Sequence, residues 1–391
     1  MHEGKTLFSQ IMEYVPRRAF ESAIARYLGD HKVQDFTCKD QWLAMAFAQL
    51  TLRTSLRGIE STLRANRSLI YHMGFRCETI SRSTLAKANE NRPWQIWADL
   101  AQHLMRKAQK LYANVKLGVD IDARIFALDS TSIHLCLERF SWALYRKDDG
   151  AVKMHVLLDL RGNIPDFIVI SDGKTHDVNI LDELDYLPGS FYIFDRGYVD
   201  FRRLFRLHQS GSFFVTRIKQ GIRFRVVESR PVDKESGVLC DQTIRLTGAT
   251  SAKNYPDRLR RIKYRDPDTG KVLVFLTNNF LLPSKVIAEL YKQRWQVELF
   301  FKWIKQHLRI KAFYGYSENA VRTQLWIAVA VYCLLAIIKK ELGADRELHE
   351  IQVILSASIF RKMPLLQAFS DIEVEIDRTR PYNYPSLFDL Q

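Results

Sequence analysis

The sequence has few cysteines and no long hydrophobic run. Its five cysteines are scattered over 391 residues without a C-x-x-C pair. This spacing argues against a disulfide scaffold and offers no zinc-binding pattern, so a reducing cytoplasm fits. The longest apolar run, residues 325–338, suits a buried helix better than a membrane span. The first residues, MHEGKTLFSQIMEYV, lack a cationic segment followed by an apolar core, which argues against export.

Acidic residues are too few to balance the basic ones. Lysine and arginine number 58 against 44 aspartates and glutamates, a net charge of +14. The resulting pI of about 9.5 favours a polyanionic partner, and nucleic acid is the leading candidate. No basic amphipathic anchor or lipidation signal is present, so we expect no membrane partner. The chain is long enough for two or three domains, and 47% of its residues are hydrophobic.

The patterns divide the chain into five regions. Residues 1–115 predict helices only, residues 116–211 mix strands and helices, residues 212–279 predict strands only, residues 280–343 predict two long helices, and residues 344–391 form a tail of unknown role. Ser284 is the expected cap of the first long helix. The predicted class is α/β, with an all-β insertion in the mixed part.

The helical region contains a candidate DNA-reading element. Ser81 or Ser83 can cap a short helix that carries Arg82 and Lys87, and a turn at Gly74 separates this helix from the preceding one. A helix-turn-helix would have this arrangement, with Arg82 and Lys87 as candidate DNA contacts. An ordinary helical hairpin has the same pattern.

The segment 291–310, YKQRWQVELFFKWIKQHLRI, predicts one amphipathic helix. At 100° per residue, a polar stripe spans an arc of about 80°, and the opposite side is apolar. The stripe consists of Tyr291, Arg294, Glu298, Lys302, Lys305 and Arg309. A solvated face, with Glu298 paired to Arg294 or Lys302, would explain it equally well.

Two aspartates follow apolar strands. Asp129 ends IFALD and Asp195 ends FYIFD, and the carboxyl ends of neighbouring strands are where sheet-based active sites collect. Together with Glu298, they could bind Mg²⁺, which prefers oxygen ligands. His134 and His176 are expected to form local hydrogen bonds, and Asp159 and Asp177 are most simply a hairpin residue and a helix cap. The rival carboxylates are Asp120, Asp122, Asp159, Asp172 and Asp177.

Three motifs resemble one known family. ALDSTSI, FDRGYVDF and the spacing Y-x2-R-x3-E-x6-K closely resemble the DDE transposases of bacterial insertion sequences. The match is to family four, the group with the Tyr-Arg-Glu-Lys signature, and it extends over residues 120–330.

The resemblance implies a ribonuclease H-like catalytic core with a β-strand insertion between the second Asp and the Glu. It implies that Asp129, Asp195 and Glu298 bind two Mg²⁺ ions, with Mn²⁺ as an alternative. Near the cleavage point, Tyr291, Arg294 and Lys305 would handle DNA. Trp295, at the edge of the polar stripe, could stack on a displaced base, although a tryptophan beside an apolar face is more often a core residue.

The expected function is a bacterial, cytoplasmic DNA transposase that acts on the terminal inverted repeats of its insertion sequence. It would cleave the element ends and join their 3′ hydroxyls to target DNA, as a homodimer in the synaptic complex. Two alternatives remain at this stage. One is a nuclease of the same fold without strand transfer, and the other is a non-catalytic DNA-binding protein.

Overall fold

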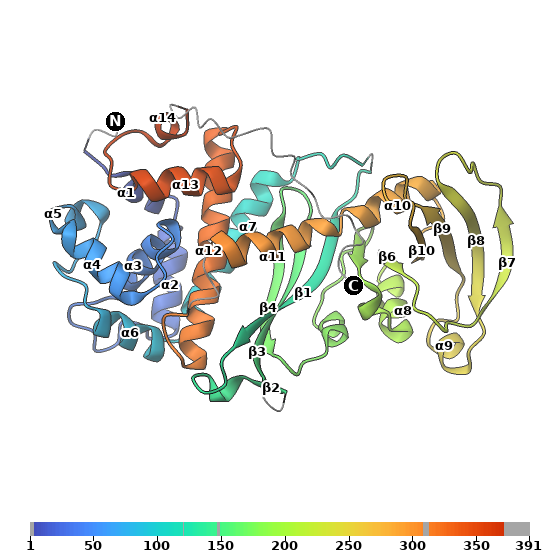
Figure 1. The fold of residues 1–391 in the computed structure, drawn as a ribbon, viewed down its shortest axis with the longest axis horizontal. Coiled ribbons are helices and arrows are strands. Elements are labelled where there is room, and N and C mark those ends of the chain that lie inside the picture. Colours follow the sequence, from blue (N-terminus) through green and yellow to red (C-terminus); the bar gives the residue numbers. More distant parts are fainter. Residues whose placement is uncertain (1–3, 120, 147–148, 308–312, 371–391) are drawn as a thin grey trace. The chain divides into compact units, whose positions relative to one another are not determined.

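The chain forms two compact units, which we call the helical unit and the sheet unit (Figure 1). The computed structural model describes residues 4–119, 121–146, 149–307 and 313–370. The helical unit contains the described residues of Met1–Ala113, Ile133–Val152 and Phe300–Arg378. The sheet unit contains those of Asn114–Ser132 and Lys153–Leu299. Each unit therefore combines segments that are distant in the sequence.

The helical unit contains helices from both ends of the chain. Its N-terminal part is helical throughout, as predicted. Its helices are α1 (Leu7–Met12), α2 (Arg17–Arg26), α3 (Cys38–Leu50), α4 (Leu56–Ala65), α5 (Arg67–Ile70), η1 (Tyr71–Met73), α6 (Arg82–Asn91), α7 (Gln95–Tyr112), η2 (Ser141–Ala143), α12 (Glu318–Leu342), α13 (Leu348–Ser358) and α14 (Leu365–Ser370). The helix α11 (Trp295–His307) passes from the sheet unit into this unit.

Helix α12 is the core of the helical unit. It packs against α3, α6, α7 and α13, and Ser317 caps it by accepting a hydrogen bond from the Ala320 N–H. It is long and apolar enough to cross a membrane, but 94% of its most hydrophobic window is buried inside the structure. The apolar run at residues 325–338 is therefore a buried helix, as predicted. All five cysteines are free thiols.

The predicted helix-turn-helix differs from the structure in its connection. Ser81 caps α6 as expected, because its Oγ accepts a hydrogen bond from the Thr84 N–H at 3.1 Å. The preceding helix, however, ends at Ala65, and α5 and η1 follow before Gly74 turns the chain at φ 93°. Eight residues, 74–81, then connect η1 to α6, which is longer than the three or four of the DNA-binding motif. Helices α4 and α6 nevertheless pack against each other.

The sheet unit is built on one mixed sheet. The sheet also includes β2 (Leu144–Arg146), which belongs to the helical unit and pairs with the first residues of β3 (Asp149–Asp159). The strand order is β2-β3-β1-β5-β6-β10-β9-β8-β7, and β4 also pairs with β3. The bounds are β1 (Ile125–Leu135), β3 (Asp149–Asp159), β4 (Ile164–Asp172), β5 (Phe191–Phe194), β6 (Phe213–Arg217), β7 (Phe224–Arg230), β8 (Val238–Leu246), β9 (Leu259–Arg265) and β10 (Val272–Thr277). The helical elements are η3 (Asp177–Asp182), η4 (Arg196–Tyr198), α8 (Phe201–Gln209), α9 (Ala249–Asn254) and α10 (Ser284–Lys292).

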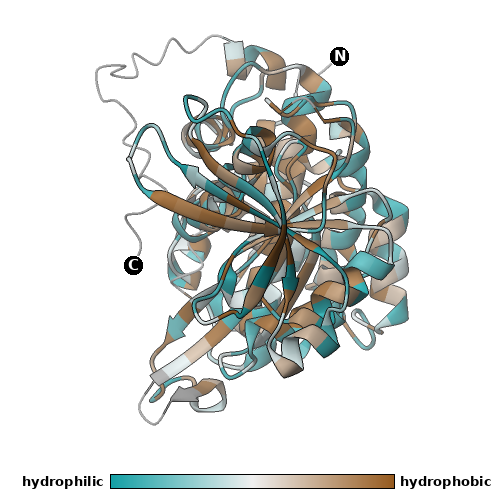
Figure 2. Cartoon of the chain, turned by 90° about the vertical axis from the view of Figure 1, so that its right-hand side faces the viewer, coloured by the Kyte–Doolittle hydropathy of each residue, from teal (hydrophilic) through white to brown (hydrophobic). Residues whose placement is uncertain are grey.

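Hydrophobic strand residues form the core of this unit, and Figure 2 shows them along the strands. Strands β1, β5 and β6 are parallel to one another. Their inner residues pack with α8 and η3 in one cluster, to which Phe126, Phe194, Leu204 and Phe214 belong. Strands β5 and β6 therefore end at the same edge of the sheet, whereas β1 continues past this edge to Leu135.

The strands predicted for residues 212–279 are present, but two details differ. The segment also contains the short helix α9, so it is not purely β. Its strands continue the central sheet, because β10 pairs with β6 and β9. The edges of β6 and β10 are thus both covered by hydrogen-bonded neighbours, as a buried sheet requires.

The segment predicted as one helix over 291–310 consists of two helices as far as it is described. Helix α10 ends at Lys292 and α11 begins at Trp295. Between them the backbone tightens, since the Arg294 N–H donates to the Tyr291 carbonyl at 3.1 Å and the Gln293 N–H to that of Leu290 at 3.0 Å. These are i to i+3 bonds, which change the phase of the side chains. Residues 308–312, which include Arg309 of the predicted stripe, lie outside the described residues.

Candidate active site

Asp129 and Asp195 lie next to each other at one edge of the sheet. Leu128 on β1 is in register with Phe194 on β5, so the residues that follow them are neighbours. The two strands therefore lie side by side, as a metal site shared by the two aspartates requires. The structure corrects one detail, because β1 continues past Asp129 to Leu135 rather than ending there.

Arg294 links Asp129 to Glu298. Its Nη1 donates to Asp129 Oδ2 at 3.0 Å, and its Nη2 donates to Glu298 Oε1. The guanidinium side chain is 12% exposed and both carboxylate side chains are 20% exposed. The i,i+4 pair of Arg294 and Glu298 expected from the sequence is therefore present, but it belongs to a larger and mostly buried ion-pair network.

Tyr291 completes the contacts on the Asp195 side. Its ring is buried against Phe275, with the ring centroids 4.9 Å apart. Its hydroxyl donates a long hydrogen bond of 3.5 Å to Asp195 Oδ1. The tightened turn before α11 thus turns Tyr291 inward to Asp195, while Arg294 reaches the other two carboxylates.

The carboxylates interact electrostatically. Burial raises the pKa of Asp129 to about 6, although Arg294 and the Ser130 N–H oppose this, and the charges of Glu298 and Asp195 raise it further. Burial lowers the pKa of Arg294, but the neighbouring Tyr291, Asp129 and Glu298 outweigh burial and raise it. A negative potential therefore surrounds a fully charged guanidinium.

A metal site is not preformed at these residues. Among residues 4–119, 121–146, 149–307 and 313–370, no three His, Cys, Asp or Glu side chains form a group that could hold a metal ion. The donor chemistry nevertheless fits a hard divalent cation, because the three coupled side chains are all carboxylates. In this structure, the cation between Asp129 and Glu298 is the guanidinium of Arg294.

The other predicted contact residues lie on helices α6 and α11. Trp295 is half-buried, and among the described residues its Nε1 has no hydrogen-bond partner. Lys305 lies on α11, in the part that belongs to the helical unit. Arg82 and Lys87 are exposed on α6, also in the helical unit.

The rival carboxylates have local roles or lie apart. Asp159 accepts from the Arg161 N–H and pairs with Arg124, as expected of a hairpin residue. Asp177 pairs with Lys153, and Asp172 accepts from Thr175. Asp122 is exposed, and Asp120 lies outside the described residues.

Two residues near the carboxylates, Arg217 and Tyr198, were not found from the sequence. Arg217 ends β6 one position after Thr216, which is in register with Phe194, and its charge acts on Tyr291. Burial raises the pKa of the Tyr198 hydroxyl, and the charges of Asp129, Asp177 and Asp195 raise it further. Arg217 could have been found from the sequence, because it ends an apolar strand much as Asp195 follows one. Nothing in the sequence distinguishes Tyr198 from an ordinary core tyrosine.

Two family models match the chain, one near its N-terminus and one over its central part. Residues 120–334 match the transposase DDE domain. Residues 3–76 match a domain of unknown function, DUF4372. The first match includes Asp129, Asp195, Arg294 and Glu298, and the second ends within the connection between η1 and α6.

Named relatives agree with the first match. The protein y4zB of Sinorhizobium fredii, described as a transposase, is 36% identical over 65% of this chain and 70% of its own length. The transposase assigned to insertion sequence element IS5377 of Geobacillus stearothermophilus is 30% identical, over 65% of this chain and 66% of its own. The transposase assigned to element IS4SA of Synechocystis is 26% identical, over 83% of this chain and 90% of its own length.

A solved structure, the piggyBac transposase synaptic complex with hairpin DNA, is similar with a TM-score of 0.49 at 10% identity, over 96% of this chain and 84% of the other. The family assignment depends on the sequence matches. The DDE domain model covers more than half of the 391 residues. The 36% identity to y4zB, over 70% of that protein's length, supports the same assignment independently. The chain therefore belongs to the DDE transposases of insertion sequences, enzymes that cleave DNA with a divalent metal and transfer the cut strand.

Proposed function

We propose that the protein binds the terminal inverted repeats of its own insertion sequence, cleaves the element ends and joins their 3′ hydroxyls to target DNA. The observation that carries this proposal is the parallel pairing of β1 and β5, which makes Asp129 and Asp195 neighbours, together with the ion pair that brings Glu298 to them. We further propose that the catalytic core is ribonuclease H-like and belongs to the Tyr-Arg-Glu-Lys group.

Asp129, Asp195 and Glu298 are the proposed metal ligands. Two bound Mg²⁺ ions, or Mn²⁺ ions, would activate the attacking water or 3′ hydroxyl and stabilise the leaving oxygen. The protein's own part is to hold the carboxylates close together and to limit their contact with bulk water, since the side chains of Asp129 and Glu298 are only one-fifth exposed. Tyr291 orients Asp195 through its hydroxyl.

Cations near this edge would position the DNA. Arg294 can form paired hydrogen bonds with a phosphate, as guanidinium groups do, and Lys305 can act as a point charge further along α11. Trp295 could stack on a displaced base, since its side chain is only half-buried. Residues 1–115, with Arg82 and Lys87, are proposed to bind the terminal repeats.

The working form is proposed to be a homodimer in the bacterial cytoplasm, because two element ends must be held together for joining. The domain boundaries inferred from the sequence, 1–115, 116–211, 212–279, 280–343 and 344–391, remain part of this proposal as functional regions. The two compact units do not follow these boundaries, so the regions describe roles along the chain.

Nicking and joining by purified protein test the function directly. A labelled duplex that ends in the terminal repeat is incubated with Mg²⁺ and a plasmid target. Asp129→Asn, Asp195→Asn and Glu298→Gln are expected to abolish both products while DNA affinity stays within a few-fold. Asp122→Asn, at an exposed residue outside the network, is the matched control. Normal joining by any of the first three variants would remove that residue from the metal site.

The same assay separates the alternative of a nuclease without strand transfer. Such an enzyme would nick the duplex but would never produce labelled plasmid. Membership of the DDE transposases favours joining, because strand transfer is the activity of the family.

A further inference from the structure

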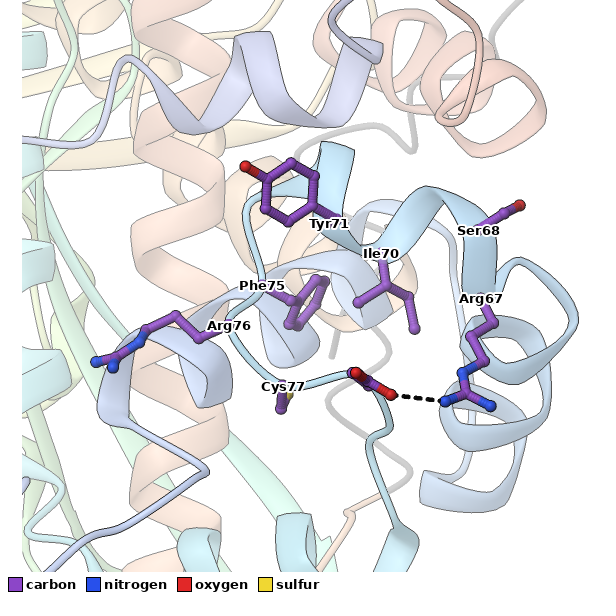
Figure 3. Close-up of a pocket in the computed structure, with 8 residues that line it drawn as sticks. Arg67, Ser68, Ile70, Tyr71, Phe75, Arg76 and Cys77 are labelled. Atoms are coloured by element: carbon purple, nitrogen blue, oxygen red, sulfur yellow. Dashed lines mark hydrogen bonds and ion pairs between the residues drawn. The ribbon is translucent and has the colours of Figure 1, made fainter.

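An open pocket in the helical unit is lined by an exposed tyrosine and two arginines. Its volume is about 410 Å³, and Figure 3 shows Ile70 and Phe75 side by side within it, with Arg67 and Arg76 extending from opposite sides. Tyr71, on η1, is 83% exposed. The pocket is lined by Arg67, Ser68, Ile70, Tyr71, Phe75, Arg76, Cys77 and Glu78.

The aromatic ring is exposed although its neighbours are buried. Ile70, Met73 and Phe75 anchor the segment in the helical core with exposures of 3%, 1% and 4%. Gly74 adopts a φ of 93°, which turns the chain so that Arg76 follows on the outside. The backbone that presents Tyr71 and Arg76 is therefore fixed by burial, and little conformational entropy would be lost on binding.

The charge around this pocket fits DNA. Residues 53–87 contain seven arginines and lysines and two glutamates, Glu60 and Glu78. Arg67 pairs with Glu78 at 2.8 Å, but both side chains are largely exposed. Such a pair is weak in water, so a phosphate can replace the glutamate at little cost.

We propose that this pocket is a DNA-binding surface for the duplex of the element end, with Arg67 and Arg76 on phosphates and Tyr71 against the sugar-phosphate backbone. Residues 67–76 fall within the match to the domain of unknown function, so this domain would be a DNA-binding module. The inference deepens the proposed function and depends on it for the identity of the DNA.

Fluorescence anisotropy with labelled terminal-repeat duplex in Ca²⁺ tests the surface. Tyr71→Ala with Arg76→Ala is expected to weaken binding about 10-fold or more and to reduce the slope of log Kd against log salt by about one. Tyr71→Phe separates ring from hydroxyl. Arg18→Ala removes an equally exposed arginine from α2 and is expected to change the affinity less than 2-fold.

Equal affinities of the Tyr71/Arg76 variant and the Arg18 variant would overturn the proposal. Unchanged affinity with an altered molar mass in light scattering would also overturn it, because the pocket would then be a protein interface. Chemistry is measured separately, as cleavage of saturating terminal-repeat DNA by the wild-type protein. Failure of the wild type to cleave would contradict the proposed function and leave the binding result intact.

A second, independent observation concerns Arg294. Its guanidinium bridges Asp129 and Glu298, two of the three proposed metal ligands, and its Nε has no partner among the described residues. A guanidinium and a divalent cation cannot both lie between the same two carboxylates.

We infer that Arg294 competes with metal for Asp129 and Glu298, and that DNA relieves this competition by drawing the guanidinium onto a phosphate. Two ligands that each bind better when Arg294 has moved must then help each other to bind. This places a barrier against metal loading, and hence against stray hydrolysis, in a protein without DNA. It depends on the proposed metal site.

Manganese binding without DNA measures the competition, with free Mn²⁺ followed by electron paramagnetic resonance. Arg294→Gln is expected to bind Mn²⁺ at least 10-fold more tightly than wild type, about 1.4 kcal/mol. Arg294→Lys, which keeps the charge but cannot bridge two carboxylates in the same way, should lie between them. Arg203→Gln is the control, because Arg203 also bridges two carboxylates, Asp182 and Asp200.

Terminal-repeat DNA should then tighten Mn²⁺ binding by a larger factor in wild type than in Arg294→Gln. Affinities equal to wild type in both Arg294 variants would overturn the inference, and the lysine variant decides if the glutamine variant does not fold. Asp129→Asn with wild-type Mn²⁺ affinity would instead contradict the proposed metal ligands.

Discussion

Replacing Asp241 by asparagine should destabilise the sheet unit strongly. Asp241 on β8 and Arg260 on β9 form a two-pronged ion pair, with distances of 2.9 and 2.6 Å and side-chain exposures of 4% each. Asp241 also accepts from Ser284 Oγ at 2.7 Å, and Arg260 donates to the Leu282 carbonyl at 2.6 Å. The pair thus ties two strands to the start of α10, the helix before Arg294 and Glu298.

The expected loss is about 3 to 5 kcal/mol, the cost of removing one partner of a buried ion pair. Asparagine keeps the shape but leaves the charge of Arg260 buried with only neutral carbonyl and hydroxyl partners. Ser284, predicted as a helix cap, donates to Asp241 instead, so its hydroxyl would lose its charged acceptor. Replacing both buried charges, in Asp241→Leu with Arg260→Met, should recover much of the loss, because the remaining partner of Asp241, Arg230, is 29% exposed and can be hydrated.

Thermal melting and hydrogen exchange of intact protein measure this effect. Exchange should rise in β8, β9 and the start of α10. Asp182→Asn removes a pair that is 40% exposed on the aspartate side and should cost about 1 kcal/mol or less. Equal losses in Asp241→Asn and Asp182→Asn would refute the assignment of stability to burial of the pair.

The same pair sets a pH dependence. Burial raises the pKa of Asp241, but hydrogen bonds from Arg260 and Ser284 and the nearby positive charges outweigh it, so the pKa is lowered. Its folded value is below its unfolded value, so this stabilisation is present above about pH 4. It is lost as the pH falls through the lower folded pKa, and Asp241→Asn should lack that loss.

Three further predictions concern pH, salt and strand positioning. Burial lowers the pKa of His155 to about 4, so the folded state binds fewer protons than the unfolded state. The free energy of unfolding should therefore fall by roughly 3 kcal/mol between pH 6.5 and 4. His155→Gln should remove this part of the loss in an acid titration followed by circular dichroism. DNA affinity should fall steeply between about 50 and 200 mM salt because several phosphates are neutralised; a flat profile in anisotropy titrations would contradict this role of the excess charge. Lys305→Ala should slow nicking or joining about 10²-fold in single-turnover kinetics on preassembled complexes, whereas wild-type rates would assign Lys305 to an ordinary solvated helix face.

Much of the sheet edge could be predicted from the sequence, because local patterns determine it. IFALD and FYIFD are short apolar runs that end in a carboxylate, and parallel pairing of their strands makes Asp129 and Asp195 neighbours. The five strand-like pieces of residues 212–279 are also present as β6 to β10. Alternation and turn residues suffice for these elements.

The bridge formed by Arg294 could not be predicted in the same way. The helical periodicity of residues 291–310 assumes a constant 100° per residue, and no proline or glycine marks the tightened turn at Gln293 and Arg294. The division into two units was equally hidden, since it depends on α12 packing against α3 and α7. Pairing between distant segments leaves no local pattern.

The burial of α12 among N-terminal helices has a consequence for synthesis of the protein. Roughly 200 residues separate the end of α7 from the start of α12, and at about 5 to 20 residues per second the ribosome needs on the order of 10 to 40 s to make them. During this interval the apolar faces of α3 and α7 lack the helix that covers them. The nascent helical unit is therefore a substrate for chaperones until residue 342 has emerged, and the protein's yield in the cell should depend on them more than its final stability suggests.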